Sequence, residues 1–392
     1  MAISLPLVLE AGRRRRTPEF GALSWGAARS LAARSLGSLA DVVGRHRASA
    51  DTLLFCARVH GVSGLLSRLT DNEPGTLPAE HAEALRHERE QVGARGRRLL
   101  EDLSTLGAAA QRGGLPLIPL KGAYLAAERY RDLSLRPAAD IDLLAPAETF
   151  APWARLLEES GYVLRHESWK NRVYIRPGHR EPDGFGEHPD NPRPVELHQR
   201  VRERFLGRFV DLTDSIVERL SDGFVGDTVT ARIPDDAALA LHLFAHAAPA
   251  AIGRGLRLIQ LVDLTHLQPR ADTVAVLREH LGEAAWGLAA LFEKGLPGAL
   301  PDALRAELGR FQPAPGRQLR WLSRPGLMTG SEEKRFLLLA ELGLCRDLAS
   351  AAGRFYDALP ERAVLQNLYG TGAGGPMTYV RALGRYCRDR LA

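Results

Sequence analysis

The sequence is poor in cysteine, in aromatic residues and in long apolar runs, and each shortage speaks against a class of protein. Its three cysteines lie far apart and in no metal-ligand spacing, so we expect no disulfide framework and a reducing, cytoplasmic location. No run of 18 or more apolar residues occurs, so we expect no membrane span. Aromatic residues make up 6% of the chain and form no stripe with basic residues, which speaks against dedicated nucleic-acid binding.

The remaining composition is ordinary for a soluble globular protein. The chain has 392 residues, 45% of them apolar and 25% charged, which is enough for a large core and two or three domains. The net charge of +5 is modest for this size and is partly concentrated in four arginines at residues 13–16. Such a run can meet nucleic acid or an anionic membrane, but a solvated basic tail is the commoner outcome and the one we favour.

Apolar spacing divides the chain into three regions. Residues 1–112 show helical periodicity behind the basic tail, and helical periodicity returns over residues 201–392. Between them, residues 113–200 contain short apolar runs separated by turn residues and by two helical stretches. The expected helices are 122–131 and 147–160, and the expected strands are 115–120, 141–144, 162–164, 173–175 and 195–197. The pattern predicts a small α/β or α+β unit between two helical regions.

The loop at residues 176–194 precedes the last of these strands. It is rich in glycine, proline, histidine and aspartate and contains no apolar run. A loop of this length is either a disordered insertion or a lid over a site.

The most informative segment is Asp140-Ile141-Asp142-Leu143-Leu144, in which two carboxylates alternate with apolar residues. Side chains alternate between the faces of a strand, so Asp140 and Asp142 share one face at about 7 Å from each other. The spacing alone is weak, because such acidic pairs are expected about six times by chance among 47 acidic residues. The context adds weight, since two carboxylates left unpaired in a buried strand would cost several kcal/mol each. A metal ion or a strong cationic partner is therefore needed.

A lysine and a glycine lie upstream, where a strand is expected to turn into a helix. The free backbone N–H groups at a helix N-terminus attract phosphate. Gly122 lets the backbone approach a ligand closely, and Lys121 adds a point charge.

A third carboxylate lies downstream in Val195-Glu196-Leu197-His198. The same alternation places Glu196 and His198 on one face of that strand. Asp140, Asp142 and Glu196 together would make a two-metal site.

Each of these residues has a plainer interpretation. Lys121-Gly122 is equally suited to a simple turn at the start of a helix. Arg136 either contacts phosphate or forms a structural salt bridge with Asp140. Glu196 and His198 would, in the plainer case, occupy the solvent face of an edge strand.

A second candidate metal site involves two histidines four residues apart on an expected helix. His242 and His246 could bind Zn²⁺ with Asp263 or His266. Both lie in an apolar stretch without the glutamate of a metalloprotease helix, so we favour buried structural histidines.

Several motifs occur together in a fixed order along the chain. They are Leu120-Lys121-Gly122, Tyr130, Arg136-Pro137, Asp140-Ile141-Asp142-Leu143-Leu144, Gly161-Tyr162 and Glu196-Leu197-His198, with His60-Gly61-Val62 and Leu65-Leu66 upstream and segments 241–248 and 258–264 downstream. This order resembles the uncharacterised nucleotidyltransferase family of the polymerase-β-like superfamily. The likeness covers about residues 50–270.

The resemblance implies an α+β fold, with a small mixed-sheet core at residues 113–200 embedded between an N-terminal and a C-terminal helical region. It also implies transfer of a nucleoside monophosphate from an NTP, ATP foremost, to an acceptor, with release of pyrophosphate. The acceptor would be a hydroxyl or similar group on a small molecule or peptide. The alternative is a non-catalytic or toxin–antitoxin-like relative that binds nucleotide, RNA or a protein partner.

By the family pattern, Asp140, Asp142 and Glu196 are catalytic and hold two Mg²⁺ ions, with Mn²⁺ as an alternative. Lys121, Gly122 and Arg136 would bind the phosphates of the nucleotide, and His198 would touch phosphate or the acceptor. One departure concerns the phosphate turn, where the superfamily usually carries Gly-Ser and this chain has Gly122-Ala123 after the lysine. Phosphate binding would then depend on backbone amides and Lys121.

Overall fold

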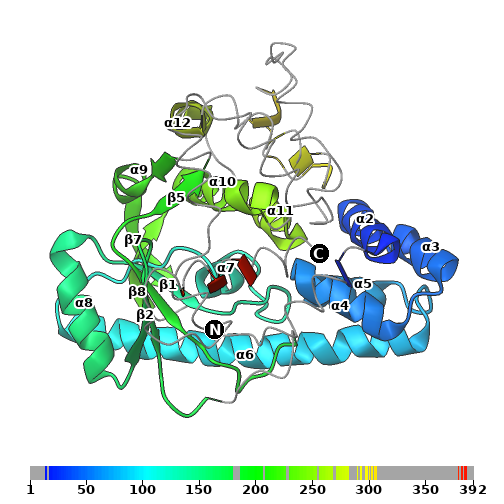
Figure 1. Cartoon of the computed structure of the whole chain (residues 1–392), viewed down its shortest axis with the longest axis horizontal. Helices are drawn as coiled ribbons and strands as arrows, with labels where there is room; N and C mark the ends of the chain where they lie inside the picture. The colour runs from blue at the N-terminus through cyan, green and yellow to red at the C-terminus, as the bar shows by residue number, and fades with distance from the viewer. Residues whose placement is uncertain are drawn as a thin grey trace.

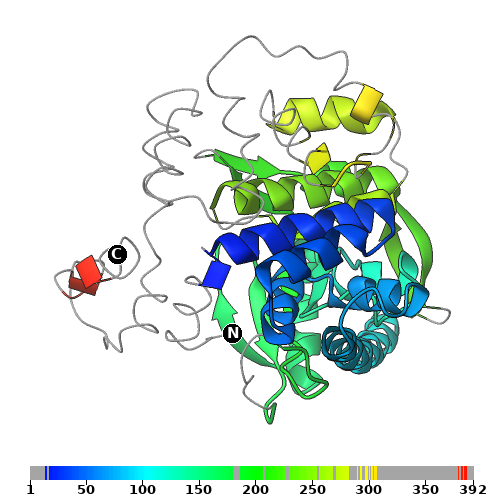
Figure 2. The ribbon, with the colours of Figure 1, turned by 90° about the vertical axis from the view of Figure 1, so that its right-hand side faces the viewer.

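The longest helix, α6 (Ala79–Arg112), runs along one side of the molecule and supports the other elements (Figure 1). Figure 2 views this helix nearly along its axis. The computed structural model describes residues 14–15, 17–179, 186–205, 208–226, 229–253, 256–267 and 271–281, with isolated positions between 289 and 306 and between 378 and 385. The helical prediction for most of the last 90 residues therefore lies outside the described residues.

The N-terminal region is helical, as the periodicity predicts. Thr17 caps the first described helix by accepting a hydrogen bond from Phe20 N, and Pro18 occupies the first turn, where its missing N–H costs nothing. The segment 73–78, which contains two prolines and a glycine, ends α5 before α6 begins. The helices of this region are α2 (Pro18–Ala33), α3 (Gly37–His46), α4 (Ala50–His60) and α5 (Ser63–Asn72).

A small mixed sheet follows, in the strand order β1-β4-β3-β2. Its strands are β1 (Ile141–Leu144), β2 (Val163–Glu167), β3 (Arg172–Ile175) and β4 (Val195–His198). The strands β1 and β4 lie side by side and parallel, and the pairs β4–β3 and β3–β2 are antiparallel. The mixed sheet, flanked by helices, confirms the predicted α+β class.

The expected helices of the core form close to their predicted bounds, as α7 (Ala123–Glu128) and α8 (Ala147–Glu159). The expected strand at 115–120 is reduced to a single bridge, between Pro119 and Leu143. The two prolines explain this, because each removes a backbone donor from the ladder. The segment still runs beside β1, since Leu120 N donates to Asp142 O and Leu144 N donates to Ile118 O.

The helical prediction is wrong for residues 202–234, which form two β-hairpins around a short helix, α9 (Thr213–Val217). The hairpins are β5 (Arg202–Phe205) with β6 (Arg208–Asp211) and β7 (Leu220–Val225) with β8 (Val229–Pro234). Alternation explains the second hairpin: Val229 and Ala231 of β8 are buried, while Thr230 and Arg232 between them are exposed. Charged residues interrupt the apolar pattern of the first hairpin, which hides its strand period.

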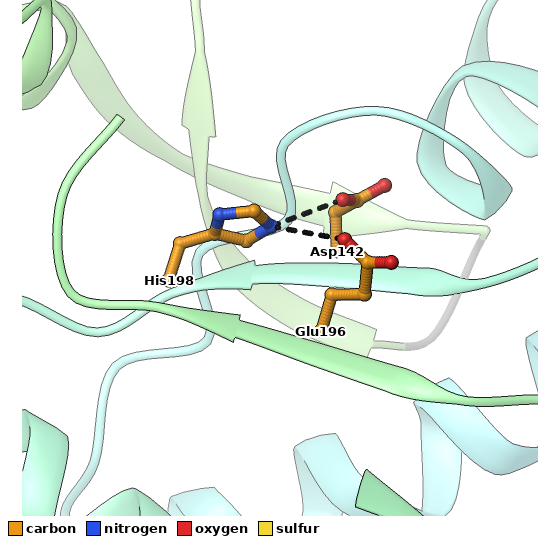
Figure 3. Close-up of side chains that lie close together, drawn as sticks. All are labelled: Asp142, Glu196 and His198. Atoms are coloured by element: carbon orange, nitrogen blue, oxygen red, sulfur yellow. Dashed lines mark hydrogen bonds and ion pairs between the residues drawn. The ribbon is translucent and has the colours of Figure 1, made fainter. Parts of the chain in front are cut away.

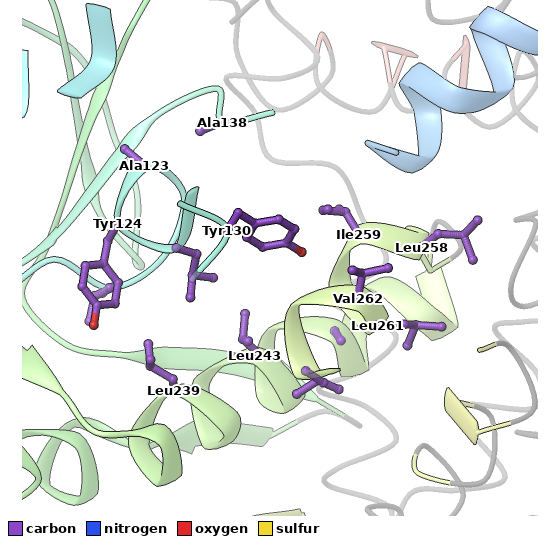
Figure 4. Close-up of a cluster of buried hydrophobic side chains, with 14 of the residues drawn as sticks. Ala123, Tyr124, Tyr130, Ala138, Leu239, Leu243, Leu258, Ile259, Leu261 and Val262 are labelled. Atoms are coloured by element: carbon purple, nitrogen blue, oxygen red, sulfur yellow. The ribbon is translucent and has the colours of Figure 1, made fainter. Parts of the chain in front are cut away.

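Helices cover the side of the core that carries Lys121 and Gly122. Figure 4 shows Tyr124 and Tyr130 facing Leu239 and Leu243 of α10 (Asp236–Gly253) and Ile259 and Val262 of α11 (Leu258–Thr265). A further helix, α12 (Ala271–Leu281), follows. Among the described residues, no helix is both long and apolar enough to span a membrane.

The described parts of the loop at 176–194 lie against α6. Arg95 of α6 forms an ion pair with Glu187 and donates to Pro192 O at 2.7 Å. Asp102 of the same helix pairs with Arg176 at 3.0 Å and with Arg193 at 2.6 Å. Residues 180–185 lie outside the described part, and the residues on either side of them are held on the helix.

His60, the last residue of α4, is a buried neutral histidine. Leu258 N donates to its Nδ1 at 3.4 Å, and its Nε2 lies 2.9 Å from Ser24 Oγ, so both ring nitrogens are used. Burial, followed by the charges of Arg15 and Arg257, lowers the pKa of His60 to about 3.

We expect acid to destabilise the protein through His60. Between the ordinary pKa of 6.5 and about 3, the unfolded chain binds a proton that the folded chain does not. The free energy of unfolding therefore decreases as the pH is lowered. The contribution of His60 to this slope approaches about 1.4 kcal/mol per pH unit. Urea unfolding at pH 7, 6 and 5 measures that slope. His60→Gln keeps a donor and an acceptor without titrating, so its slope should be shallower by this amount. Equal slopes would contradict the assignment.

Candidate active site

The parallel pairing of β1 and β4 brings together residues that lie more than fifty positions apart. Their register aligns Asp142 with Glu196 and Leu144 with His198. The alternate positions Ile141, Leu143, Val195 and Leu197 are buried in the core. Asp142, Glu196 and His198 therefore project from one face of the two strands (Figure 3).

These three side chains form a close group. His198 Nε2 lies 3.2 Å from Asp142 Oδ1 and 3.6 Å from Glu196 Oε2. One ligand atom from each residue lies within 4.8 Å of the other two. The side chains of Asp142 and His198 are almost fully buried, while that of Glu196 is 25% exposed and accepts a 2.6 Å hydrogen bond from Asn171. Glu196 and His198 thus lie at the site and not on a remote solvent face.

Lys121 completes the group from the turn before α7. Its Nζ lies 3.4 Å from Asp142 Oδ1, and its side chain is 14% exposed. Burial disfavours its charged form, but the carboxylates of Asp142, Asp140 and Glu196 outweigh burial and raise the pKa of Lys121. The lysine is therefore a fixed positive charge beside three carboxylates.

Asp140 precedes β1 and lies close to Gly122, as the other oxygen of Asp142 does. A Cβ atom built on Gly122 would lie 3.2 Å from Asp140 Oδ1 and 3.3 Å from Asp142 Oδ2. Burial and the negative charges of Asp142 and Glu196 raise the pKa of Asp140. The pKa of Asp142 is lowered despite its burial, because Lys121 and His198 favour its charged form.

Asp142 Oδ2 is buried and has no hydrogen-bond partner among the described residues. A buried carboxylate oxygen without a partner is costly, and a cation would satisfy it. The donor set of carboxylate oxygens and one imidazole nitrogen fits a divalent cation.

Gly122→Ala should reduce turnover by about 10-fold, because its Cβ would lie 3.0 Å from Asp140 O, 3.2 Å from Asp140 Oδ1 and 3.3 Å from Asp142 Oδ2, so that both aspartates must shift slightly. Gly122 has φ +60° and ψ −115°, outside the left-handed helical region, so a non-glycine residue there costs more than the roughly 1–2 kcal/mol of that region. Gly161→Ala is the control for positive φ, since Gly161 has φ +82° and nothing within 4 Å of the added atom. Both variants should lose stability in urea unfolding, and only the first should lose activity. Equal activity of the two variants would contradict the role of Gly122.

Arg136 has a partner that the sequence did not indicate. Its Nε and Nη2 donate to the two carboxylate oxygens of Asp263 at 2.7 and 2.8 Å, and its Nη1 donates to Gly122 O at 2.9 Å. Tyr130 OH donates to the same carboxylate at 2.8 Å. Asp263, and not Asp140, is therefore the ion-pair partner of Arg136 among the described residues. The contact of Arg136 with phosphate stays a prediction, while its Nη1 holds the Gly122 turn and its Nε and Nη2 are engaged with Asp263.

A second polar group lies on the α10 side, and sequence reasoning missed most of it. His246 Nδ1 lies 2.9 Å from Glu203 Oε1, and Lys170 also pairs with Glu203. The charge of Lys121, followed by burial, lowers the pKa of His246 to about 4, and burial lowers that of His242. Asp263 is already bonded elsewhere, so it is not a partner for a zinc ion at these histidines. Glu203 stands between two arginines in the sequence, and no local signal marks it as buried.

Comparison with known proteins adds one finding. A family model described as uncharacterised nucleotidyltransferase matches residues 46–281. The match begins at the end of α3, ends with α12 and contains every site residue named above. No curated protein and no solved structure matches the chain.

Proposed function

Because the chain belongs to the uncharacterised nucleotidyltransferase family, we propose that it transfers a nucleoside monophosphate from an NTP to an acceptor and releases pyrophosphate. ATP is the nucleotide we expect first. The acceptor would carry a hydroxyl or similar nucleophile on a small molecule or peptide. The family supports the reaction class, and the site supports a reaction that depends on divalent ions.

One observation carries the proposal. Asp142 has one oxygen beside His198 and Lys121, and the other, near Gly122 and Asp140, has no hydrogen-bond partner among the described residues. A carboxylate with two further carboxylates close by could hold divalent ions of the kind that two-metal phosphoryl transfer uses.

Asp140, Asp142 and Glu196 would hold the ions, with Mg²⁺ foremost and Mn²⁺ as an alternative. When bound, the ions would neutralise charge on the triphosphate and lower the pKa of the acceptor hydroxyl. Lys121, which pairs with Asp142 at 3.4 Å, is placed to neutralise phosphate oxygens as pyrophosphate leaves. Glu196 is more exposed than Asp142, so it is the carboxylate more open to the proton of the acceptor. His198 would then touch phosphate or orient Asp142.

The test uses the full chain with each of the four ribonucleoside triphosphates and Mg²⁺. Nucleotide binding is measured by calorimetry, and pyrophosphate release is measured with a pool of small alcohols and hydroxyl-bearing peptides as acceptors. Binding that requires the metal, with metal-dependent pyrophosphate release, would support the proposal. Absence of binding to all four nucleotides would reject it and favour the non-catalytic alternative, in which the fold binds RNA or a protein partner.

A further inference from the structure

We propose that His198 binds the ion directly through Nε2, and that Asp142, Glu196 and His198 form a subsite that prefers a first-row transition ion such as Mn²⁺ over Mg²⁺. The inference rests on the proposed function and deepens it, because it names the ion class of one of the two cation positions. It assigns His198 a role different from contact with phosphate or acceptor.

The two spacings that involve the imidazole are close to those of ligands around one ion, and all three donor atoms lie within 4.8 Å of one another. Bonds of about 2.1 Å place neighbouring ligand atoms about 3.0 Å apart in an octahedron and about 3.4 Å apart in a tetrahedron. His198 Nε2 lies 3.2 Å from the Asp142 oxygen and 3.6 Å from the Glu196 oxygen. Only small side-chain movements separate this arrangement from a coordinated one. Figure 3 shows the ring nitrogen directed at both carboxylates.

The position of the imidazole is fixed by the fold. His198 is the last residue of β4, and its side chain is 2% exposed. Its backbone is held by the ladder with β1 and by the hydrogen bond from Ala145 N to its carbonyl. A ligand held this rigidly loses little conformational entropy on binding an ion.

The charges around the group leave room for a divalent cation. Among the described residues, Arg136 is neutralised by Asp263, and Glu203 is paired with Lys170 and His246. Asp140, Asp142 and Glu196 are then opposed by Lys121. Three carboxylates against one lysine leave an excess of acidic groups, which a divalent ion would offset.

The two oxygens of Asp142 separate two kinds of cation position. Oδ1 lies beside the imidazole of His198, whereas Oδ2, without a partner among the described residues, lies with Asp140 Oδ1 near Gly122. Mg²⁺ prefers oxygen ligands and keeps several waters, while imidazole suits transition ions such as Zn²⁺, Fe²⁺ and Ni²⁺. Mn²⁺ also favours oxygen ligands but, as a transition ion, accepts an imidazole more readily than Mg²⁺ does. The oxygen-only position would therefore suit the Mg²⁺ that arrives with the triphosphate, and the mixed position would select a transition ion.

The test measures Mn²⁺ binding to the metal-free full chain, with Mn²⁺ alone and no nucleotide. Electron paramagnetic resonance gives the affinity, and electron spin-echo modulation reports whether a ¹⁴N nucleus is bonded to the ion. We expect ¹⁴N modulation in the unaltered protein and its loss in His198→Gln, with Mn²⁺ affinity lower by at least about 10-fold. Affinity for Mg²⁺, measured by competition, should change far less, so that the preference for Mn²⁺ falls.

His166→Gln is the matched control, because His166 is an exposed histidine on β2 of the same sheet. It should keep both the affinity and the ¹⁴N signal. Absence of ¹⁴N modulation in the unaltered protein would overturn the inference even if the variant failed to fold, and so would an unchanged affinity in folded His198→Gln. Manganese bound through nitrogen in a protein that binds no NTP would reject the proposed function and keep the metal assignment. Metal-dependent NTP turnover without the nitrogen signal would support the proposed function and reject the metal assignment of His198.

Discussion

Asp142→Asn is expected to lower the rate of pyrophosphate release by at least about 1,000-fold, the largest loss of activity that we anticipate from one substitution. The amide keeps the shape of the side chain but removes the negative charge shared by both cation positions. A 1,000-fold loss corresponds to about 4 kcal/mol of transition-state stabilisation, which is within what metal-ion catalysis contributes. Steady-state kinetics with saturating metal and nucleotide measure it.

The same substitution should lower the free energy of unfolding of the metal-free protein, because Lys121 and His198 favour the charged form of Asp142 and hold its pKa below the ordinary value. Relief of the repulsion that raises the pKa of Asp140 offsets part of this loss. Urea unfolding in chelator tests this sign. Asp222→Asn on β7 replaces an exposed strand carboxylate, 92% exposed, and should change neither activity nor stability. Turnover in Asp142→Asn within tenfold of the unaltered protein would reject the catalytic scheme.

The sequence pattern was sufficient to predict which face of each of the two strands carries the site residues. Alternation over residues 140–144 and 195–198 depends only on the two-residue period of a strand, so Asp142, Glu196 and His198 could be placed on polar faces. The sequence pattern does not predict that these two faces meet. The parallel register of β1 with β4 depends on the chain between them, and no local pattern states which strand a given strand will pair with.

Ion pairs between residues far apart in the sequence could not be predicted from it. Arg136 and Asp263 are separated by 127 positions, and Glu203 reaches His246 across 43. Arg136 and Glu203 look like ordinary surface charges in their own segments, and the apolar surroundings of Asp263 and His246 do not indicate their partners. The hairpins at 202–234 were missed for a related reason, because charged residues interrupt the strand alternation there and apolar residues dominate the helices that follow.

Asp263→Ala is expected to lower the free energy of unfolding by about 3–5 kcal/mol, because it leaves the buried guanidinium of Arg136 without a counter-charge. Both partners are nearly fully buried, with side chains 9% and 1% exposed. The hydroxyl of Tyr130 loses its acceptor as well. Urea unfolding measures the loss. Glu167→Ala is the control, since Glu167 pairs with Arg172 on the exposed edge of the sheet and such a pair contributes about 0–1 kcal/mol.

Arg136→Lys separates the two roles that remain open for this arginine. Lysine keeps the charge but lacks the planar fork that bonds both oxygens of Asp263 and the carbonyl of Gly122 together. If Arg136 mainly holds the turn, the variant loses unfolding free energy, and its catalytic rate constant falls because Gly122 and the aspartates around it shift. If Arg136 mainly binds phosphate, the KM for the nucleotide rises while stability changes little. The engagement of Nε, Nη1 and Nη2 with protein oxygens predicts the first result, and a raised KM in an equally stable variant would contradict it.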